Sequence, residues 1–163
     1  MQEKEVRLMI SFKREFVLKA PVAKVFQYIS NPLNEMEYIP GVIDIYNVSG
    51  EGMGLKCQWT YKIMGLRLNG EAEIVEYEPD LRYVIKTKGD VESTWDWTFK
   101  EEPGQTRLKL RVDYSFSTPV LNQVGEVMLK VLNRHEANYA MAILKKRLEE
   151  QKEYSSHLIS EHP

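Results

Sequence analysis

The residues of this chain that could take part in chemistry are few, and most of them are aromatic. Tyrosine and tryptophan offer hydroxyl and indole N–H groups within a large apolar surface. The side chains of this kind on the expected inner parity are Trp59, Tyr61, Tyr83, Trp95, Trp97 and Tyr114, accompanied by Thr87 and Ser93. A single ring of this kind is most often ordinary core. A group of rings with a few polar groups is typical of a pocket for an apolar small molecule.

Candidates for an acid or a base are scarce. The strongest is His135 in the segment NRHEAN, which lies one helical turn beyond Val131 and two beyond Met128. If these three residues share a helix face, His135 lies toward the same space, where an imidazole could exchange protons near neutral pH. The alternative is that NRHEAN is exposed at a helix bend. Three further polar residues accompany it, namely Arg134, Glu136 and Asn138.

Arg14 is the one basic residue that shares its parity with apolar neighbours, here Phe12, Phe16 and Leu18. An arginine there could hold a ligand carboxylate, although such a side chain more often reaches solvent. The expected ligand-binding set is therefore Trp59, Tyr61, Tyr83, Trp95, Trp97, Tyr114, Met128, Val131, His135 and Arg14. His135 is the only catalytic candidate.

Other motifs carry little. Cys57 reads as a small buried hydrophobe, and the three glycines between 50 and 54 precede a strand, so they are hairpin residues and not a phosphate loop. His157 and His162 lack the further ligands that a metal would need. We expect no metal and no cofactor.

Composition narrows the class of protein. The chain has 163 residues, with 22 basic and 24 acidic side chains that give a net charge of -2. This balance argues against a nucleic-acid partner, which would require a basic stripe. A single cysteine allows no internal disulfide. The N-terminal residues contain no apolar stretch of signal-peptide length, and nowhere are eighteen consecutive residues apolar. We expect a cytoplasmic protein without stable membrane insertion, either a monomer or a homodimer.

The positions of the chemistry-bearing residues depend on a run of strands with alternating apolar and charged side chains. One example alternates Leu108, Leu110 and Val112 with Arg107 and Lys109. This period predicts an antiparallel sheet with one wet and one buried face. The expected strands are 8–18, 42–48, 55–64, 66–77, 81–88, 91–101 and 105–117. Their short connections predict that strands adjacent in sequence pair as hairpins.

Helices are expected at three places. Pro21 begins a helix with an inner stripe of Val22, Val25, Phe26 and Ile29, and Asn31-Pro32 begins a short helix with Leu33, Met36 and Tyr38. After Thr118-Pro119 a stripe of Val124, Met128, Val131, Asn138, Met141, Leu144 and Leu148 predicts one helix of about nine turns, from Pro119 to about Lys152. The boundaries are a flexible N-terminus (1–6), one domain (7–152) and a polar tail (153–163).

The sheet must cover its buried face, and the C-terminal helix is the only element long enough. At this point the chain resembles the SRPBCC superfamily, also called START-like or Bet v 1-like. The resemblance covers about residues 10–150. It rests on FVLKAPVAKVFQYISNP, GMGLKCQWTYKIMG, LRLNGEAEIVEYEPDLRY, WDWTF and AILKKRLEE. The chain is most similar to the polyketide cyclase/dehydrase-like or CoxG-like branch. The resemblance implies an α+β helix-grip fold, a seven-stranded antiparallel sheet wrapped around a long C-terminal helix.

Three functions remain open. The first is a carrier or sensor of a hydrophobic small molecule (a lipid, a quinone or a polyketide-like compound) without catalysis. The second is a metal-independent cyclase/dehydratase with His135 as base and Tyr61 and Tyr114 as hydrogen-bond donors. The third is a protein-interaction module whose cavity is filled by its own side chains, which would show an exposed apolar patch instead of a pocket.

Overall fold

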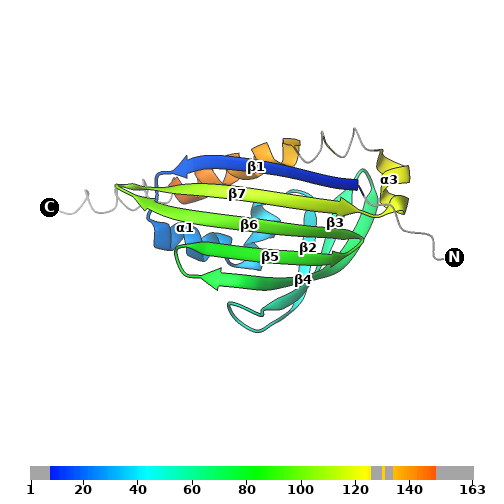
Figure 1. Cartoon of the computed structure of the whole chain (residues 1–163), viewed down its shortest axis with the longest axis horizontal. Helices are drawn as coiled ribbons and strands as arrows, with labels where there is room; N and C mark the ends of the chain where they lie inside the picture. The colour runs from blue at the N-terminus through cyan, green and yellow to red at the C-terminus, as the bar shows by residue number, and fades with distance from the viewer. Residues whose placement is uncertain (1–7, 126–129, 131–133, 150–163) are drawn as a thin grey trace.

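A computed structural model of the chain describes residues 8–125, 130 and 134–149, and its central element is a seven-stranded antiparallel sheet (Figure 1). The strands are β1 (Leu8–Leu18), β2 (Val42–Ser49), β3 (Lys56–Ile63), β4 (Leu66–Glu78), β5 (Arg82–Gly89), β6 (Val91–Glu102) and β7 (Gln105–Phe116). Their order is β1-β7-β6-β5-β4-β3-β2. Each strand from β2 onward therefore pairs with the next, as predicted, and β1 pairs with β7.

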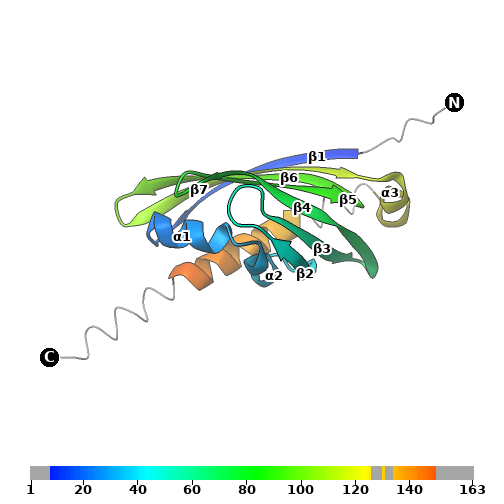
Figure 2. The ribbon, with the colours of Figure 1, turned by 90° about the horizontal axis from the view of Figure 1, so that it is seen from below.

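The two faces of the sheet differ as the alternation predicts. In β7 the side chains of Leu108, Leu110 and Val112 are buried, whereas Lys109 and Arg111 between them are exposed. All helices that the structure describes between β1 and β2, and the C-terminal helical segment, lie on the buried side of the sheet (Figure 2). The sheet thus has one solvated face and one face that the helices partly cover.

The helix α1 (Val22–Ile29) covers the buried face near one end of β6 and β7. It buries the predicted stripe of Val22, Val25, Phe26 and Ile29. The ring of Phe26 packs edge-on against Phe99, with 5.1 Å between ring centroids. Ring packing therefore contributes to filling this end of the sheet.

A 3-10 turn (Pro32–Asn34) and the short helix α2 (Glu35–Tyr38) follow, and Asn31 caps the turn by accepting a hydrogen bond from the Leu33 amide at 3.2 Å. The three apolar residues of the predicted short helix differ in burial. Leu33 and Met36 are 44% and 39% exposed, whereas Tyr38 and Ile39 are buried. Tyr38 is the buried residue of this four-residue helix. Glu35 lies three residues before it, and residues three apart share a helix face, so Glu35 also lies on the side of the helix that faces the sheet.

The expected single helix from Pro119 to Lys152 is interrupted. The helix α3 (Thr118–Val124) ends at Gly125, whose φ of +85° is the left-handed conformation that commonly terminates helices. Helical structure is described again at residue 130 and over 134–149. The glycine is thus a stop and not a tolerated interruption. Lys152 and the predicted tails lie outside the described residues.

The segment 134–149 packs against the sheet and α1 with a stripe that agrees with the predicted one at Leu144 and Leu148 and differs from it before them. The buried residues are Ala137, Ala140, Leu144 and Leu148, whereas Asn138 is exposed. The end of the segment is fixed by Lys24, whose Nζ donates to the Leu148 carbonyl at 3.2 Å. The contact surface therefore changes from small residues at one end to leucines at the other.

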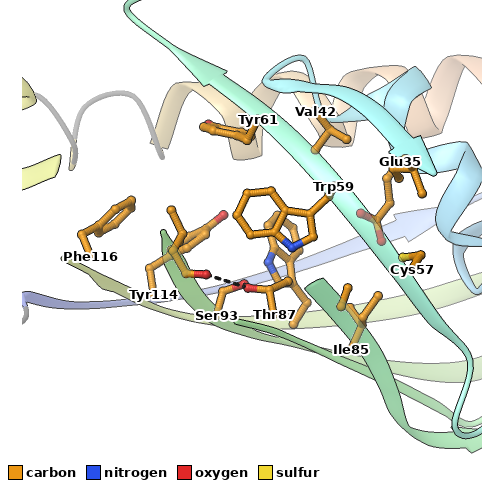
Figure 3. Close-up of a pocket in the computed structure, with 14 residues that line it drawn as sticks. Glu35, Val42, Cys57, Trp59, Tyr61, Ile85, Thr87, Ser93, Tyr114 and Phe116 are labelled. Atoms are coloured by element: carbon orange, nitrogen blue, oxygen red, sulfur yellow. Dashed lines mark hydrogen bonds between the residues drawn. The ribbon is translucent and has the colours of Figure 1, made fainter. Parts of the chain in front are cut away.

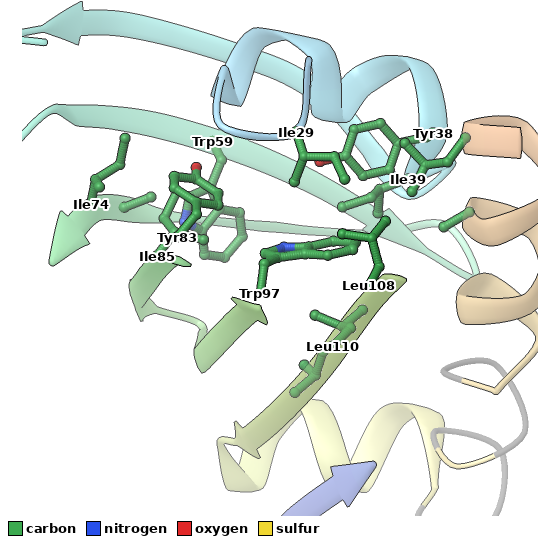
Figure 4. Packing of buried hydrophobic residues seen from close by; sticks show 14 of the residues in the cluster. Ile29, Tyr38, Ile39, Trp59, Ile74, Tyr83, Ile85, Trp97, Leu108 and Leu110 are labelled. Atoms are coloured by element: carbon green, nitrogen blue, oxygen red, sulfur yellow. The ribbon is translucent and has the colours of Figure 1, made fainter. Parts of the chain in front are cut away.

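The packed part of the core includes two of the predicted ligand-binding rings. Tyr83 and Trp97 are almost completely buried among aliphatic side chains, Tyr38 of α2 and Ile39, which follows that helix (Figure 4). The Tyr83 hydroxyl is buried without a hydrogen-bond partner. Neither ring lines the pocket described below.

The leucine end of the C-terminal segment should carry much of its docking energy. We expect Leu144→Ala to lower the free energy of unfolding by about 2–5 kcal/mol, because a fully buried leucine is replaced by a cavity. The exposed neighbour Lys145 provides the control, since Lys145→Ala should change the free energy of unfolding by less than about 0.5 kcal/mol. Urea denaturation measures both, and equal effects of the two substitutions would contradict this packing.

Candidate functional site: an aromatic pocket with a buried carboxyl group

A pocket lies on the buried face of the sheet, where the helices do not fill it. The volume that a water-sized sphere can occupy in it is about 70 Å³, which is smaller than typical small-molecule sites, so a ligand of several rings would have to displace side chains of the wall. Strands β2 to β7 and helix α2 contribute the lining residues, which are Glu35, Val42, Ile45, Cys57, Trp59, Tyr61, Ala72, Ile85, Thr87, Val91, Ser93, Trp95, Tyr114 and Phe116 (Figure 3). Most of this surface is apolar.

Aromatic rings form a continuous part of the wall. Trp95 meets Tyr114 edge-on with 5.8 Å between centroids, and Tyr114 stacks on Phe116 at 5.7 Å. The indole N–H of Trp59 donates to the Glu71 carbonyl at 3.1 Å, so this ring offers its apolar face rather than a free donor. Such a wall favours contact with apolar and aromatic groups of a ligand.

A hydroxyl pair supplies polar groups on the sheet. The Oγ1 atom of Thr87 and the Oγ atom of Ser93 lie 2.6 Å apart on the adjacent strands β5 and β6 (Figure 3). Thr87 Oγ1 also lies 3.3 Å from the Val91 carbonyl, to which it can donate. The pair can rearrange to donate to, or accept from, one polar atom of a ligand.

Glu35 is the acidic residue of the lining. It extends from α2 toward Cys57 and the interior of the pocket (Figure 3). Glu35 as a residue is partly buried, and the loss of water around its carboxyl group raises the pKa of that group to about 8. Among the described residues no charged or hydrogen-bonding partner offsets this loss of water. The same loss of water raises the pKa of the Cys57 thiol to about 11, with a smaller contribution from Glu35. At neutral pH both groups are therefore uncharged.

A second carboxyl group lies beside the pocket. Glu136, from the C-terminal segment, accepts a hydrogen bond from the hydroxyl of the lining residue Tyr61. Burial raises the pKa of Glu136 to about 7, although the Tyr61 hydrogen bond acts in the opposite direction. The Tyr61 ring lies so close to Gly41 that a Cβ atom there would come within 2.0 Å of it. Glycine at position 41 thus makes room for this ring.

Four of the predicted ligand-binding rings line the pocket, namely Trp59, Tyr61, Trp95 and Tyr114. Thr87 and Ser93 also line it. Met128 and Val131 lie outside the described residues. The structure brings these four rings to one space because β3, β6 and β7 place them on the same face of the sheet.

His135 and Arg14 occupy other positions. His135 is exposed, so the expectation that it faces the cavity is not met, and the adjacent Glu136 points to Tyr61 instead. Arg14 lies 5.3 Å above the Phe12 ring and lines a separate hollow with Lys130 and Arg134. In this segment His135 is exposed and the next residue, Glu136, is half-buried.

Glu35 is the residue that sequence reasoning missed. The signal that could have found it is its spacing of three from Tyr38, since residues three apart share a helix face. An inner face made of Leu33 and Met36 would instead turn Glu35 outward. Among the described residues no three histidine, cysteine or acidic side chains come together in a metal-binding group.

The buried acid should make stability depend on pH. The raised pKa of Glu35 means that the folded state holds a proton which the unfolded chain releases above about 4.5, so its contribution to stability is lost as pH rises toward 8. Glu35→Gln should remove this dependence. We expect the difference in unfolding free energy between variant and parent to increase with pH, with a slope approaching 1.4 kcal/mol per pH unit, about that of one proton.

Urea titrations between pH 5 and 8 measure this slope. Glu73→Gln serves as the control, because Glu73 is exposed on β4 and its replacement should leave the difference unchanged over the same range. Parallel stability curves for the Glu35→Gln variant and the parent would contradict a buried, protonated Glu35.

The sequence model of a family described as polyketide cyclase / dehydrase and lipid transport matches residues 9–149 of the chain. No curated protein matches it at a significant level. No helix in the described part of the chain has the length and apolar character required to cross a membrane.

Solved structures are similar in fold. TTHA0849 from Thermus thermophilus has a TM-score of 0.72 at 20% identity, covering 85% of this chain and 97% of its own. The Zhui aromatase/cyclase from Streptomyces sp. R1128 has 0.68 at 12% identity, covering 87% and 94%. Ara h 8.0201 has 0.60 at 16% identity, covering 84% and 96%. At these identities the similarity extends to the fold alone.

Proposed function

This chain belongs to the polyketide cyclase / dehydrase and lipid transport family, and we propose that it holds a hydrophobic small molecule in the aromatic pocket as a carrier or sensor. The observation that carries the proposal is the lining itself. Rings and aliphatic side chains from six strands line a concave apolar pocket. This lining supports ligand binding over the alternative of an interaction module.

The energetics are sufficient for useful affinity. Burial of apolar surface contributes roughly 25 cal/mol per Å², so a ligand that buries a few hundred Å² gains several kcal/mol before the cost of association. The few polar groups of the wall, such as Thr87 and Ser93, would then select among ligands of similar shape. The ligand class that fits is a fused-ring or long-chain compound with few polar groups.

Filling the pocket should abolish binding. Ala72 is buried in β4 and lines the pocket, so Ala72→Phe should weaken binding of the uncharged probe 1-naphthalenemethanol at least about tenfold, because its ring occupies the ligand space. Isothermal calorimetry measures the affinity. Val42→Trp, at the half-buried rim, is a second filling variant.

Ala142→Phe is the matched control, since Ala142 is exposed on the C-terminal segment and its replacement should leave binding unchanged. Near-ultraviolet circular dichroism checks that each variant is folded. If both folded pocket variants bound the probe as tightly as the parent, or if the parent bound no apolar probe, the proposal would fail.

A second candidate, a cyclase/dehydratase-type enzyme, is favoured by one observation. Glu35 and Glu136 have pKa values raised to about 8 and about 7, which suits proton transfer near neutral pH. In this proposal the two carboxyl groups replace His135 as acid and base, and Tyr114, which lines the pocket, donates to the developing enolate.

Exchange of the α-hydrogens of 2-tetralone in deuterated buffer tests this second candidate by NMR. An enzyme should accelerate exchange about 100-fold or more over buffer, and Glu35→Gln or Glu136→Gln should each remove most of that acceleration. Exchange at the buffer rate with the parent protein would leave binding as the function.

A further inference from the structure

The charge of the pocket is one-sided. Among the described lining residues, Glu35 is the one that carries a carboxyl group, and none is lysine, arginine or histidine. Glu136 adds a second carboxyl group behind Tyr61. Lys56, Lys86 and Lys88 line a second hollow, which shares Cys57 and Ala72 with the pocket. Arg14 and Arg134 line a third hollow. The described lining of the pocket therefore supplies no counter-ion for a negative charge at Glu35.

The groups that face Glu35 come from several elements, and all are neutral at pH 7. They are Tyr38 of α2 itself, Cys57 of β3, Tyr83 of β5 and Tyr114 of β7, and burial raises the pKa of each. An isolated carboxylate in such surroundings is costly, and it is strongly stabilised only by a positive partner. In the free protein the Glu35 carboxyl group retains its proton and so carries no charge.

The rings beside Glu35 provide a second attraction for positive charge. Trp59, Trp95 and Tyr114 line the same pocket, and the faces of such rings attract cations, most strongly where water is excluded. The same faces repel an anion. A wall of rings with one carboxyl group is thus complementary to an organic cation and not to a fatty-acid carboxylate.

We propose that the natural guest of this pocket is a hydrophobic amine, with its ammonium group beside the Glu35 carboxylate and its apolar body among the rings. The inference rests on the proposed function and names its ligand class. The proton balance is simple. A guest that arrives as ammonium displaces the Glu35 proton to solvent, and one that arrives as free base receives it on nitrogen. In both cases the occupied pocket has no net charge at Glu35.

Three probes that share one ring system test this proposal by calorimetry at pH 7. They are 1-naphthylmethylamine, 1-naphthalenemethanol and 1-naphthoic acid, which are positive, neutral and negative. We expect the amine to bind at least about tenfold more tightly than the alcohol, and the acid most weakly. Titrations in phosphate and in Tris should report release of close to one proton per bound amine, and none for the alcohol.

Glu35→Gln retains the size of the side chain and cannot ionise. It should abolish both the amine preference and the proton release while the alcohol still binds, which shows that the pocket is intact. The exposed control Glu73→Gln should keep both effects. The proposal is overturned if the alcohol binds as tightly as the amine, or if Glu35→Gln keeps the preference. Binding of the alcohol alone would leave the proposed function standing, and no binding of any probe would remove both.

Discussion

The structure depends on how the helices cover the apolar face of a curved seven-stranded sheet. At one end α1 and the leucines of the C-terminal segment, Leu144 and Leu148, fill the space against the sheet. Toward the other end the segment presents Ala137 and Ala140, which are too small to replace them. Protein interiors are otherwise packed nearly as densely as organic crystals. The pocket therefore follows from the size of the side chains along one helix, which changes while the sheet continues.

The loss of water in this pocket explains its unusual chemistry. Burial acts in the same direction on the acids, the thiol and the phenols, since it disfavours the charged form of each, and no basic residue of the described lining reverses it. Glu136 differs from Glu35 because Tyr61 donates to it, which moderates its pKa. The Glu35 carboxyl group thus lies in the pocket without a hydrogen-bond partner among the described residues, whereas the Glu136 carboxyl group is held at the pocket wall by Tyr61.

Much of the fold follows from local patterns in the sequence. Alternation predicted β1 to β7, and the stripe of α1 was correct, because period and turn residues act over short distances. The errors have one cause, which is the rotation of a helix about its axis. In the short helix α2 the sequence did not indicate that Glu35 would face inward, and in the C-terminal segment Glu136 and not His135 lies at the pocket wall. The rings of the site were predictable from strand parity, whereas Tyr83 and Trp97 were not separable from them because depth along the sheet is a tertiary property.

The central claim is that the space between the rings is occupied by a guest. The most direct test is an isotope-filtered NOE experiment with uniformly labelled protein and unlabelled 1-naphthalenemethanol. The account predicts contacts from the probe to the methyl groups of Ile45, Ile85 and Val91, which line the pocket on β2, β5 and β6. Contacts confined to methyl groups outside the lining, such as those of the exposed Val48 or Leu81, would contradict it.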